Sequence, residues 1–279
     1  MSADAVARRD EAPAPAGRPS EYLSAYRVDP KLALRVWQRE LTLYKRIWPS
    51  TILSTLFDPI LYLLAIGFAL GQYVSGVGEG TYAQFIAPGM VATAVMHGAA
   101  YEAAWNSYVR IFVERSYEAM MSTPAALEDV LAGEVLWAAS RAVASSTIVL
   151  LVVTAFGLVS SPWAALIPLV AVVGGVMFTT LGLCYTVGRE HMDQLTFMFT
   201  LGITPMFLFS GVFFPLSGLP AWAQALAWAS PLFHLVEVVR GLATGVPGPW
   251  MLGHVAWMLA LTALAWGYPA RVLRRRIRA

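Results

Sequence analysis

Six long apolar runs constrain the fold of this 279-residue chain more than any other feature. A helix needs about 20 consecutive, mainly apolar residues to cross the hydrocarbon core of a bilayer, and each run reaches that length. Only 13% of the residues are charged, where a soluble domain carries about 25%. The runs therefore predict an all-α integral membrane protein with six transmembrane helices, at residues 50–73, 85–109, 136–158, 163–187, 195–214 and 250–269.

The positions of the basic residues predict the orientation of the six spans. They cluster in the connections on one side of the bundle, at Lys45, Arg46, Arg110, Arg115, Arg189 and five arginines between positions 271 and 278. The connections on the other side, residues 74–84 and 160–162, contain neither Lys nor Arg. Because short basic connections stay in the cytoplasm, we expect both termini to be cytoplasmic.

Two segments precede the first span. Residues 1–28 combine alanine, proline and charge without an apolar stretch, which predicts a disordered cytoplasmic tail and not a secretory signal. In residues 29–48, polar and apolar positions recur at helical spacing, with Asp29 as N-cap and Pro30 in the first turn. The basic face and the tryptophans predict an amphipathic helix on the cytoplasmic membrane surface, with docking on a partner protein as the alternative. The transmembrane domain then comprises residues 49–279.

The fifth span is succeeded by a segment that turns back. Prolines and a glycine between positions 215 and 220 end the helix, and Ser230–Pro231 separates two short helical stretches, 221–229 and 232–242. At 1.5 Å per residue each piece covers about 15 Å, half the thickness of the hydrocarbon core. Residues 215–243 therefore predict an extracytoplasmic re-entrant helical hairpin between the fifth and sixth spans.

The sequence FLFSGVFFPLSGLPAWAQALAWASPLFHLVEVVRG at residues 207–241 resembles the C-terminal signature of the ABC-2 exporter permeases. It contains the element FPL-x-x-LP-x-W, then a Pro-Leu pair and a closing Glu-x-x-Arg-Gly. Within that family the chain is most similar to the permeases that export lipochitooligosaccharides, the Nod factors, with some similarity to polysaccharide and drug exporters. The resemblance implies a homodimer in a bacterial cytoplasmic (inner) membrane, served by two separate ATP-binding subunits.

Residues 114–134 form the longest charged connection on the cytoplasmic side. Through Glu118, Thr123–Pro124 and Gly133 they resemble the family's coupling helix, which seats in a groove of the ATP-binding subunit. Ser116 and Tyr117 differ from its usual small residues, and Glu134 stands where a lysine is common. The resemblance implies that the residues contacting the ATPase are Glu114, Arg115, Glu118, Thr123 and Pro124. A solvated loop without a partner is the alternative.

The resemblance also implies that the hairpin closes the outer end of a translocation path. The residues expected to form this gate are Pro215, Leu219, Pro220, Trp222, Pro231, Glu237 and Arg240. Arg240 is the one basic residue on the outer side, and Glu237 lies three positions before it, where the two side chains can pair.

The resemblance implies that the first and fifth spans line the translocation path, and aromatic side chains of the second and fifth spans are the candidates for contact with a cargo. Tyr101, Trp105 and Tyr108 recur at helical spacing on one face, and Phe207 and Phe213 belong to the fifth span. Aromatic faces can bind sugar rings, but Trp and Tyr in membrane proteins also serve packing and interfacial anchoring. A lipid-linked oligosaccharide or lipooligosaccharide is the first candidate cargo, and a hydrophobic drug or antibiotic is the second.

The chain lacks a motif for using ATP itself. A phosphate-binding loop requires G-x-x-x-x-G-K-[ST], and neither Lys31 nor Lys45 stands after such a glycine pattern. We therefore expect a transport subunit that is not an enzyme and has no cofactor of its own, with ATP and Mg²⁺ bound by the partner. Cys184, His191 and His234 lack metal-ligand spacing, so no metal site is expected.

An ion-coupled secondary transporter, or a membrane-bound enzyme, is the alternative class. Such transporters place acidic groups or histidines along an ion path, and the candidates are Asp58, His97, Glu102 and Arg141. Asp58 precedes Pro59, which predicts a hydrogen-bonded carboxylate near a kink. His97 and Glu102, five residues apart, lie on different parts of a helix face. We expect Arg141 to reach the cytoplasmic headgroups, or to pair with Asp58.

Overall fold

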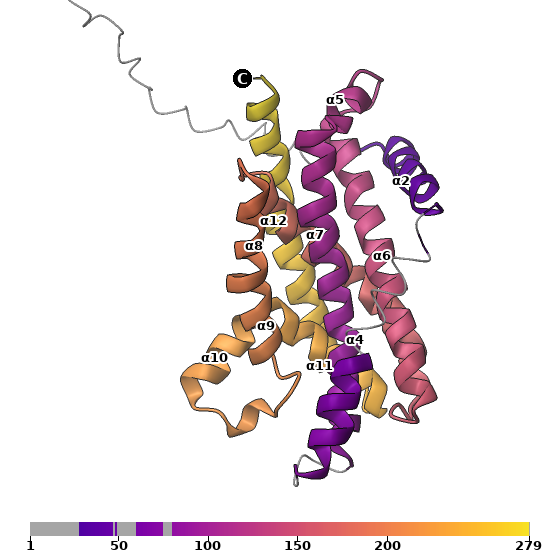
Figure 1. The fold of residues 1–279 in the computed structure, drawn as a ribbon, viewed down its shortest axis with the longest axis vertical. Helices are drawn as coiled ribbons and strands as arrows, with labels where there is room; N and C mark the ends of the chain where they lie inside the picture. Colours follow the sequence, from indigo (N-terminus) through magenta and orange to yellow (C-terminus); the bar gives the residue numbers. More distant parts are fainter. Residues whose placement is uncertain (1–27, 47, 49–59, 75–79, 279) are drawn as a thin grey trace, which may run out of the picture.

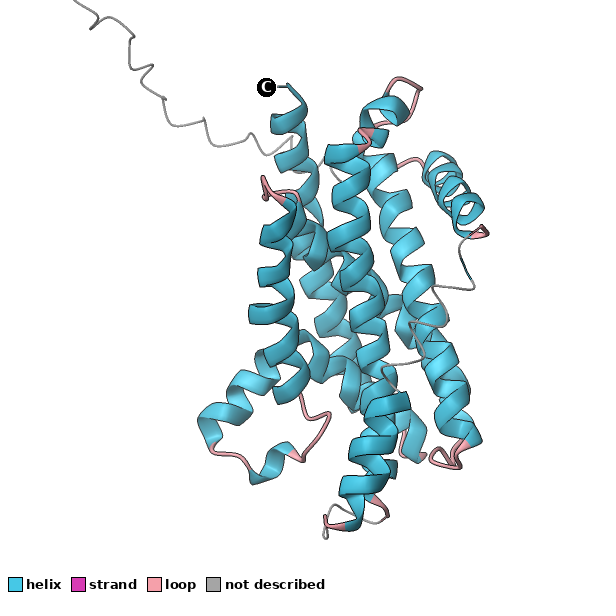
Figure 2. Cartoon of the chain, in the orientation of Figure 1, coloured by secondary structure: helices cyan, strands magenta, loops and turns pink. Residues whose placement is uncertain are grey.

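The computed structural model describes residues 28–46, 48, 60–74 and 80–278, which contain helices and no strand (Figures 1 and 2). The predictions made for residues 1–27 and for Asp58 lie outside this part of the chain. The helices before the hairpin are α2 Pro30–Tyr44, η1 Leu63–Ala69, η2 Leu70–Gln72, α4 Tyr82–Tyr101, η3 Glu102–Asn106, η4 Val109–Val113, α5 Ser116–Met121, α6 Leu127–Ala155, η5 Pro162–Leu166 and α7 Ile167–Thr186. The remaining helices are η6 Met192–Gln194, α8 Leu195–Phe197, η7 Met198–Ile203, α9 Thr204–Phe209, η8 Leu216–Gly218, α10 Ala221–Ala229, α11 Pro231–Thr244 and α12 Trp250–Arg278.

Four of the described helices are long and apolar enough to cross a membrane, at Leu127–Ala155, Pro162–Thr186, Met192–Phe209 and Trp250–Arg276. They correspond to the predicted third to sixth spans. The third span begins at Leu127, nine residues earlier than predicted. The fifth ends at Phe209 and not at residue 214, and the helix of the sixth continues beyond the predicted end at Pro269. The described part of the first predicted span is the shorter apolar helix Ile60–Gln72. The total of six spans stays a prediction.

The helix predicted within residues 29–48 is present as α2, and its start has the expected cap, while its place at the membrane surface stays a prediction. The Asp29 carboxylate accepts a hydrogen bond from the Lys31 backbone N–H at 2.8 Å, and Pro30 occupies the first turn. Its buried side is formed by Ala33, Val36 and Glu40. This side packs along α6 of the same chain, so the helix is held by its own bundle.

Gly133 allows α2 to lie directly on α6. A Cβ atom at Gly133 would lie 2.6 Å from the Ala33 carbonyl oxygen and 2.5 Å from the Val36 Cβ, closer than real Cβ atoms approach. Two hydrogen bonds add to the contact. The Trp37 indole N–H donates to the Ser140 hydroxyl at 3.0 Å, and the Asp29 N–H donates to the Asp129 carboxylate at 2.7 Å.

The two ends of the bundle contain different helices (Figure 1). We call the end with α5 and the C-terminus of α12 the coupling end, and the opposite end, with α10, the hairpin end. Between them, the apolar core is formed mainly by α4, α6, α7, α11 and α12. In α7, Gly174 and Gly175 let neighbours approach, because a Cβ at either position would meet Leu235 or Ala139 at 3.0 Å.

Candidate functional site

The predicted coupling segment contains a short helix, α5, at the coupling end. Ser116 and Tyr117 are buried and attach this helix to the bundle. Burial also raises the pKa of the Tyr117 hydroxyl well above its ordinary value, so this side chain stays neutral. The residues expected to contact an ATPase are all exposed, namely Glu114, Arg115, Glu118, Thr123 and Pro124. The second half of the segment, from Leu127, belongs to the long helix α6.

Arg115 gives the coupling segment its sharp turn. Its backbone has φ 51° and ψ 31°, the left-handed conformation, which costs a non-glycine residue about 1–2 kcal/mol. The residue lies between η4 and α5, and beside it the Ser116 hydroxyl donates to the Glu114 carboxylate at 3.1 Å. Strained backbone of this kind gathers at functional positions.

A cluster of buried charges lies beneath the coupling segment. We call Glu40, Glu102, Arg110, Glu134 and Arg141 the charge cluster. The Arg110 guanidinium lies 3.2 Å from the Glu40 carboxylate and 2.7 Å from the Glu102 carboxylate, and it also pairs with Glu134. Arg141 pairs with the other oxygen of Glu102 at 2.5 Å. The cluster therefore joins α2, the π-helical end of the second predicted span, and α6.

The carboxylates of the charge cluster are deeply buried, and their oxygens are hydrogen-bonded except Glu134 Oε2, which has no partner among the described residues. Their exposed fractions are 3% or less for Glu40, Glu102 and Glu134. Glu102 accepts from the Trp137 indole N–H at 2.9 Å and from the Asn106 amide at 2.6 Å, and Glu134 accepts from the Ser107 hydroxyl at 2.6 Å. Buried charges need such partners, because an unpaired one would cost several kcal/mol.

Arg141 pairs with Glu102, a buried carboxylate on the neighbouring helix. Its reach to the cytoplasmic headgroups stays a prediction, and Asp58, its other predicted partner, lies outside the described residues. His97 lies apart from Glu102, with its ring 5.9 Å from that of Phe207. Sequence reasoning missed Glu40 and the paired role of Arg110. The sequence did contain a sign of the cluster, because Glu40 is a charged residue at helical spacing from Ala33 and Val36, on the buried face of α2.

The aromatic candidates for a cargo path do not form one surface. Tyr101, with an exposed fraction of 52%, and Trp105 both lie 6.5 Å from the Phe199 ring. Tyr108 is only 6% exposed, and its hydroxyl donates to the Glu190 carbonyl at 2.7 Å. The π-helical turn η3 lies between Tyr101 and Tyr108 and changes their angular spacing, so α-helical periodicity misplaces Tyr108.

Phe207 and Phe213 pack against each other at the end of the fifth predicted span. Their ring centroids are 4.7 Å apart, and Phe207 also contacts the Tyr62 ring at 5.7 Å. Phe207 is buried, and Phe213 is partly buried against the apolar core. Within one chain these two rings therefore serve packing.

Two short helices occupy the hairpin segment, as predicted. They are α10 and α11, and the first helix has the predicted bounds. The predicted pair of Glu237 and Arg240 is confirmed at 3.0 Å. Arg240 also donates to the Gly211 carbonyl at 2.6 Å and lies over the Phe85 ring at 4.5 Å. The depth of the two helices in a bilayer stays a prediction.

The two helices of the hairpin differ strongly in burial. The gate candidates on or before α10 are mainly exposed, with Trp222 at 71%, whereas Pro231 begins the largely buried α11. The α11 residues Leu232, Leu235 and Val239 lie in the apolar core. In Figure 1, α10 lies outside the bundle, while α11 is overlapped by other helices. Within the hairpin, α11 is therefore packed into the core, while most of α10 is exposed.

A histidine pair attaches α11 to α12. His234 Nδ1 lies 2.7 Å from His254 Nδ1, and His234 Nε2 lies 2.9 Å from the Trp228 carbonyl oxygen. The His234 ring also stacks on Trp257 at 4.0 Å. Sequence reasoning considered His234 alone, because His254 lies twenty residues later on another helix.

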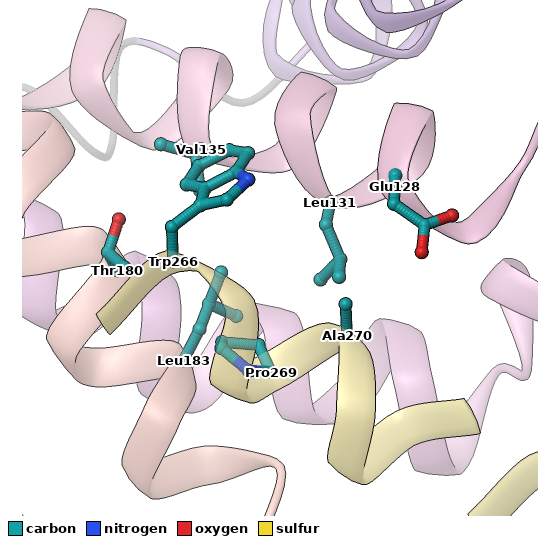
Figure 3. Close-up of a pocket in the computed structure, with 8 residues that line it drawn as sticks. All are labelled: Glu128, Leu131, Val135, Thr180, Leu183, Trp266, Pro269 and Ala270. Atoms are coloured by element: carbon teal, nitrogen blue, oxygen red, sulfur yellow. The ribbon is translucent and has the colours of Figure 1, made fainter. Parts of the chain in front are cut away.

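Figure 3 shows a small void between α6, α7 and α12. It is lined by Glu128, Leu131, Val135, Thr180, Leu183, Trp266, Pro269 and Ala270. Its volume is about 10 Å³, the space of roughly one water molecule. A cargo such as a drug or an oligosaccharide does not fit there.

Four helices of membrane length, the short helix α5 that precedes them and the two short helices α10 and α11 at the other end define a polytopic α-helical membrane protein. Residues 32–243 match the ABC-2 type transporter family, and the chain belongs to it. Members of this family are membrane subunits of transporters, which confirms the resemblance seen in the sequence.

Several relatives match most of the chain. Nodulation protein J of Neorhizobium galegae is 32% identical over 245 residues, covering 87% of this chain and 92% of that protein. Nodulation protein J of Sinorhizobium fredii is 31% identical over 92% of this chain and 98% of that protein. The inner membrane transport permease YadH of Escherichia coli is 26% identical over 74% of this chain and 80% of that protein.

Proposed function

We propose that this chain is the permease subunit of an ATP-driven exporter that moves an amphiphile with a sugar head group, such as a lipooligosaccharide, out of the bacterial cytoplasm or inner leaflet. The observation that carries the proposal is the similarity to Nodulation protein J over 87% of the chain. Membership of the family does not by itself identify the cargo. The similarity to Nodulation protein J favours an oligosaccharide-bearing lipid, and a drug or antibiotic is the second candidate.

The proposed exporter contains two copies of this chain and two ATP-binding subunits in the cytoplasmic membrane, with both termini in the cytoplasm. The cargo passes between the two copies. Support comes from large apolar side chains that remain exposed on the helix Ile60–Gln72 and along α8 to α9, among them Leu64, Phe68, Phe197 and Leu201. Such surfaces face lipid or a second copy.

ATP-driven closure of the partner subunits would press on the exposed coupling segment. The buried Tyr117 and the charge cluster connect this segment to α2 and α6, so the displacement would reach the spans. The hairpin at the opposite end would open and close the outer exit. This division of roles is supported by the placement of α5 and α10 at opposite ends of the bundle (Figure 1).

The test is ATP hydrolysis by the assembled complex in proteoliposomes. The chain would be co-expressed with an ABC ATPase subunit from the same genome. We expect ATPase activity that rises with a lipooligosaccharide and falls at least about tenfold in Glu118→Lys, because charge reversal at the contact repels the partner. Glu190→Lys is the control, since Glu190 is an exposed carboxylate outside the coupling segment.

Transport by the chain alone, driven by a proton gradient and independent of ATP, would contradict the proposal in favour of an ion-coupled transporter. If a drug stimulated the ATPase activity of the complex and lipooligosaccharides did not, the assignment as an exporter would stand and the proposed cargo would change to a drug.

A further inference from the structure

A groove lies between the C-terminal end of α2 and the middle of α6. It is lined by Leu41, Tyr44, Lys45, Trp48, Arg141, Ala144, Ser145 and Ile148. Its volume is about 270 Å³, close to the lower end of ligand pockets, which begin near 300 Å³. It is open to the surface and separate from the helices α8 to α9 that are proposed to line the cargo path.

The groove is polar at one end and apolar at the other. Among the groove residues of α6, Arg141 lies nearest the coupling segment, and α2 adds Lys45, next to the Tyr44 ring that Arg141 covers. Along α6, Arg141, Ala144 and Ile148 recur at helical spacing, so the wall extends roughly 10 Å toward the hairpin end and becomes apolar. This stretch of α6 lies within a helix that is long and apolar enough to cross a membrane. The gradient therefore runs from the expected headgroup level into the hydrocarbon level.

The polar end carries excess positive charge. Lys45 is exposed and forms no ion pair with any described residue. Arg141 is neutralised on one side by Glu102, and its guanidinium lies over the Tyr44 ring at 5.0 Å, where the ring forms the wall of the groove. A ligand that matches this end is an anion.

We propose that the groove binds one anionic glycerophospholipid of the cytoplasmic leaflet. The phosphate would lie beside Lys45 at the mouth, within reach of Arg141, and the first part of one acyl chain would lie on Ala144 and Ile148. Tyr44 and Trp48 would flank the glycerol region, where amphipathic rings are favoured. A soluble anion would use only the polar end and leave the apolar wall in water. The proposal does not rest on the proposed cargo or on ATP.

The test uses the full chain in detergent micelles and dibrominated lipids, which quench nearby tryptophans. Because the chain has ten tryptophans, the signal of Trp48 is the difference between the wild type and Trp48→Phe. We expect dibrominated phosphatidylglycerol to quench Trp48 at a low mole fraction, and dibrominated phosphatidylcholine to need at least about tenfold more. The anionic headgroup gains about 1 kcal/mol per nearby cation, and reversing one cation also adds a repulsive charge.

Two variants test the two ends of the groove separately. Lys45→Glu should raise the half-quenching mole fraction about tenfold, while Arg46→Glu, the exposed neighbour outside the groove, should raise it by only about threefold, because its charge acts from farther away. Ala144→Phe fills the apolar half and should abolish Trp48 quenching, whereas Leu151→Phe, an exposed residue on the same helix, should not. Each variant is first checked for an unchanged gel-filtration profile.

Equal quenching by the two lipids would overturn the proposal, as would equal effects of Lys45→Glu and Arg46→Glu. Protection of Trp48 by inorganic phosphate at the same concentration as the lipid would also overturn it, because a free anion would then be the ligand.

Discussion

The coupling end and the hairpin end of this permease are held together by different forces. At the coupling end, three helices distant in sequence share buried carboxylates with Arg110 and Arg141. At the hairpin end, α11 is buried in the apolar core, while α10 exposes most of its surface. A well-paired buried network has one favourable arrangement, whereas a helix with few contacts has many. The coupling end is therefore suited to transmit a displacement, and α10 is suited to move.

The largest expected effect concerns the charge cluster. Arg110→Met leaves Glu40, Glu102 and Glu134 without their shared partner and should lower the free energy of unfolding by about 3–5 kcal/mol. Arg240→Met at the hairpin end should cost only about 1–2 kcal/mol, because its partner Glu237 is half-exposed. Thermal unfolding in detergent, monitored by fluorescence, compares the two variants.

A second variant separates charge from packing at the same position. Adding Glu134→Gln to Arg110→Met removes one unpaired carboxylate and should recover part of the loss. If Arg110→Met and Arg240→Met lowered the free energy of unfolding by the same amount, the two ends would not differ in how much their buried charges stabilise them.

A pair of leucines tests the two helices of the hairpin. Leu235 of α11 is fully buried, and Leu235→Ala should cost about 2–5 kcal/mol. Leu226 of α10 is largely exposed, and Leu226→Ala should stay within about 0.5 kcal/mol. The midpoint of thermal unfolding reports both. A large loss for Leu226→Ala would mean that α10 is covered in the isolated chain.

Two glycines in helix interiors test the contact of α2 with α6. Gly133→Ala places a Cβ 2.6 Å from the Ala33 carbonyl oxygen and should cost about 1–3 kcal/mol. At Gly253 of α12 nothing lies within 4 Å, so Gly253→Ala should be neutral or stabilising by about 0.5–1 kcal/mol. Limited proteolysis should also cut α2 faster in Gly133→Ala only. An unchanged midpoint for Gly133→Ala would show that α2 can move away without loss.

The smallest expected effect is a pH dependence at Glu40, which faces Arg39, Arg110, Glu102 and Glu134. Burial raises the pKa of the Glu40 carboxyl above its ordinary value of 4.5, although Arg110 acts in the opposite direction. The folded state then binds the proton more tightly than the unfolded state. Stability should therefore be highest below pH 4.5 for this group and fall as the pH rises through the folded pKa.

Glu40→Gln should flatten this dependence at pH values above 4.5. The measurement is the unfolding midpoint of both proteins across that range. A wild-type midpoint that rises with pH, and is matched by the variant, would show that Glu40 does not set the slope.

Local patterns were predictable from the sequence, and contacts between distant segments were not. Asp29 and Pro30 fix the start of α2 through neighbouring atoms, and Ser230–Pro231 divides α10 from α11 in the same way. The pair of Glu237 and Arg240 lies within one helical turn. Arg110 and Glu40, in contrast, are seventy residues apart. Periodicity assigns a residue to a face of its helix, but it does not give the neighbour of that face.

The π-helical turn η3 has a consequence for variation among relatives of this protein. A turn of this kind amounts to one residue inserted into an α-helix. Deleting a single residue from Glu102–Asn106 would therefore turn this stretch into ordinary α-helix and leave the residues after it on their present faces. Arg110 would still reach Glu134, and Tyr108 the Glu190 carbonyl. A homologue with a one-residue gap at this turn would keep the charge cluster that holds α2.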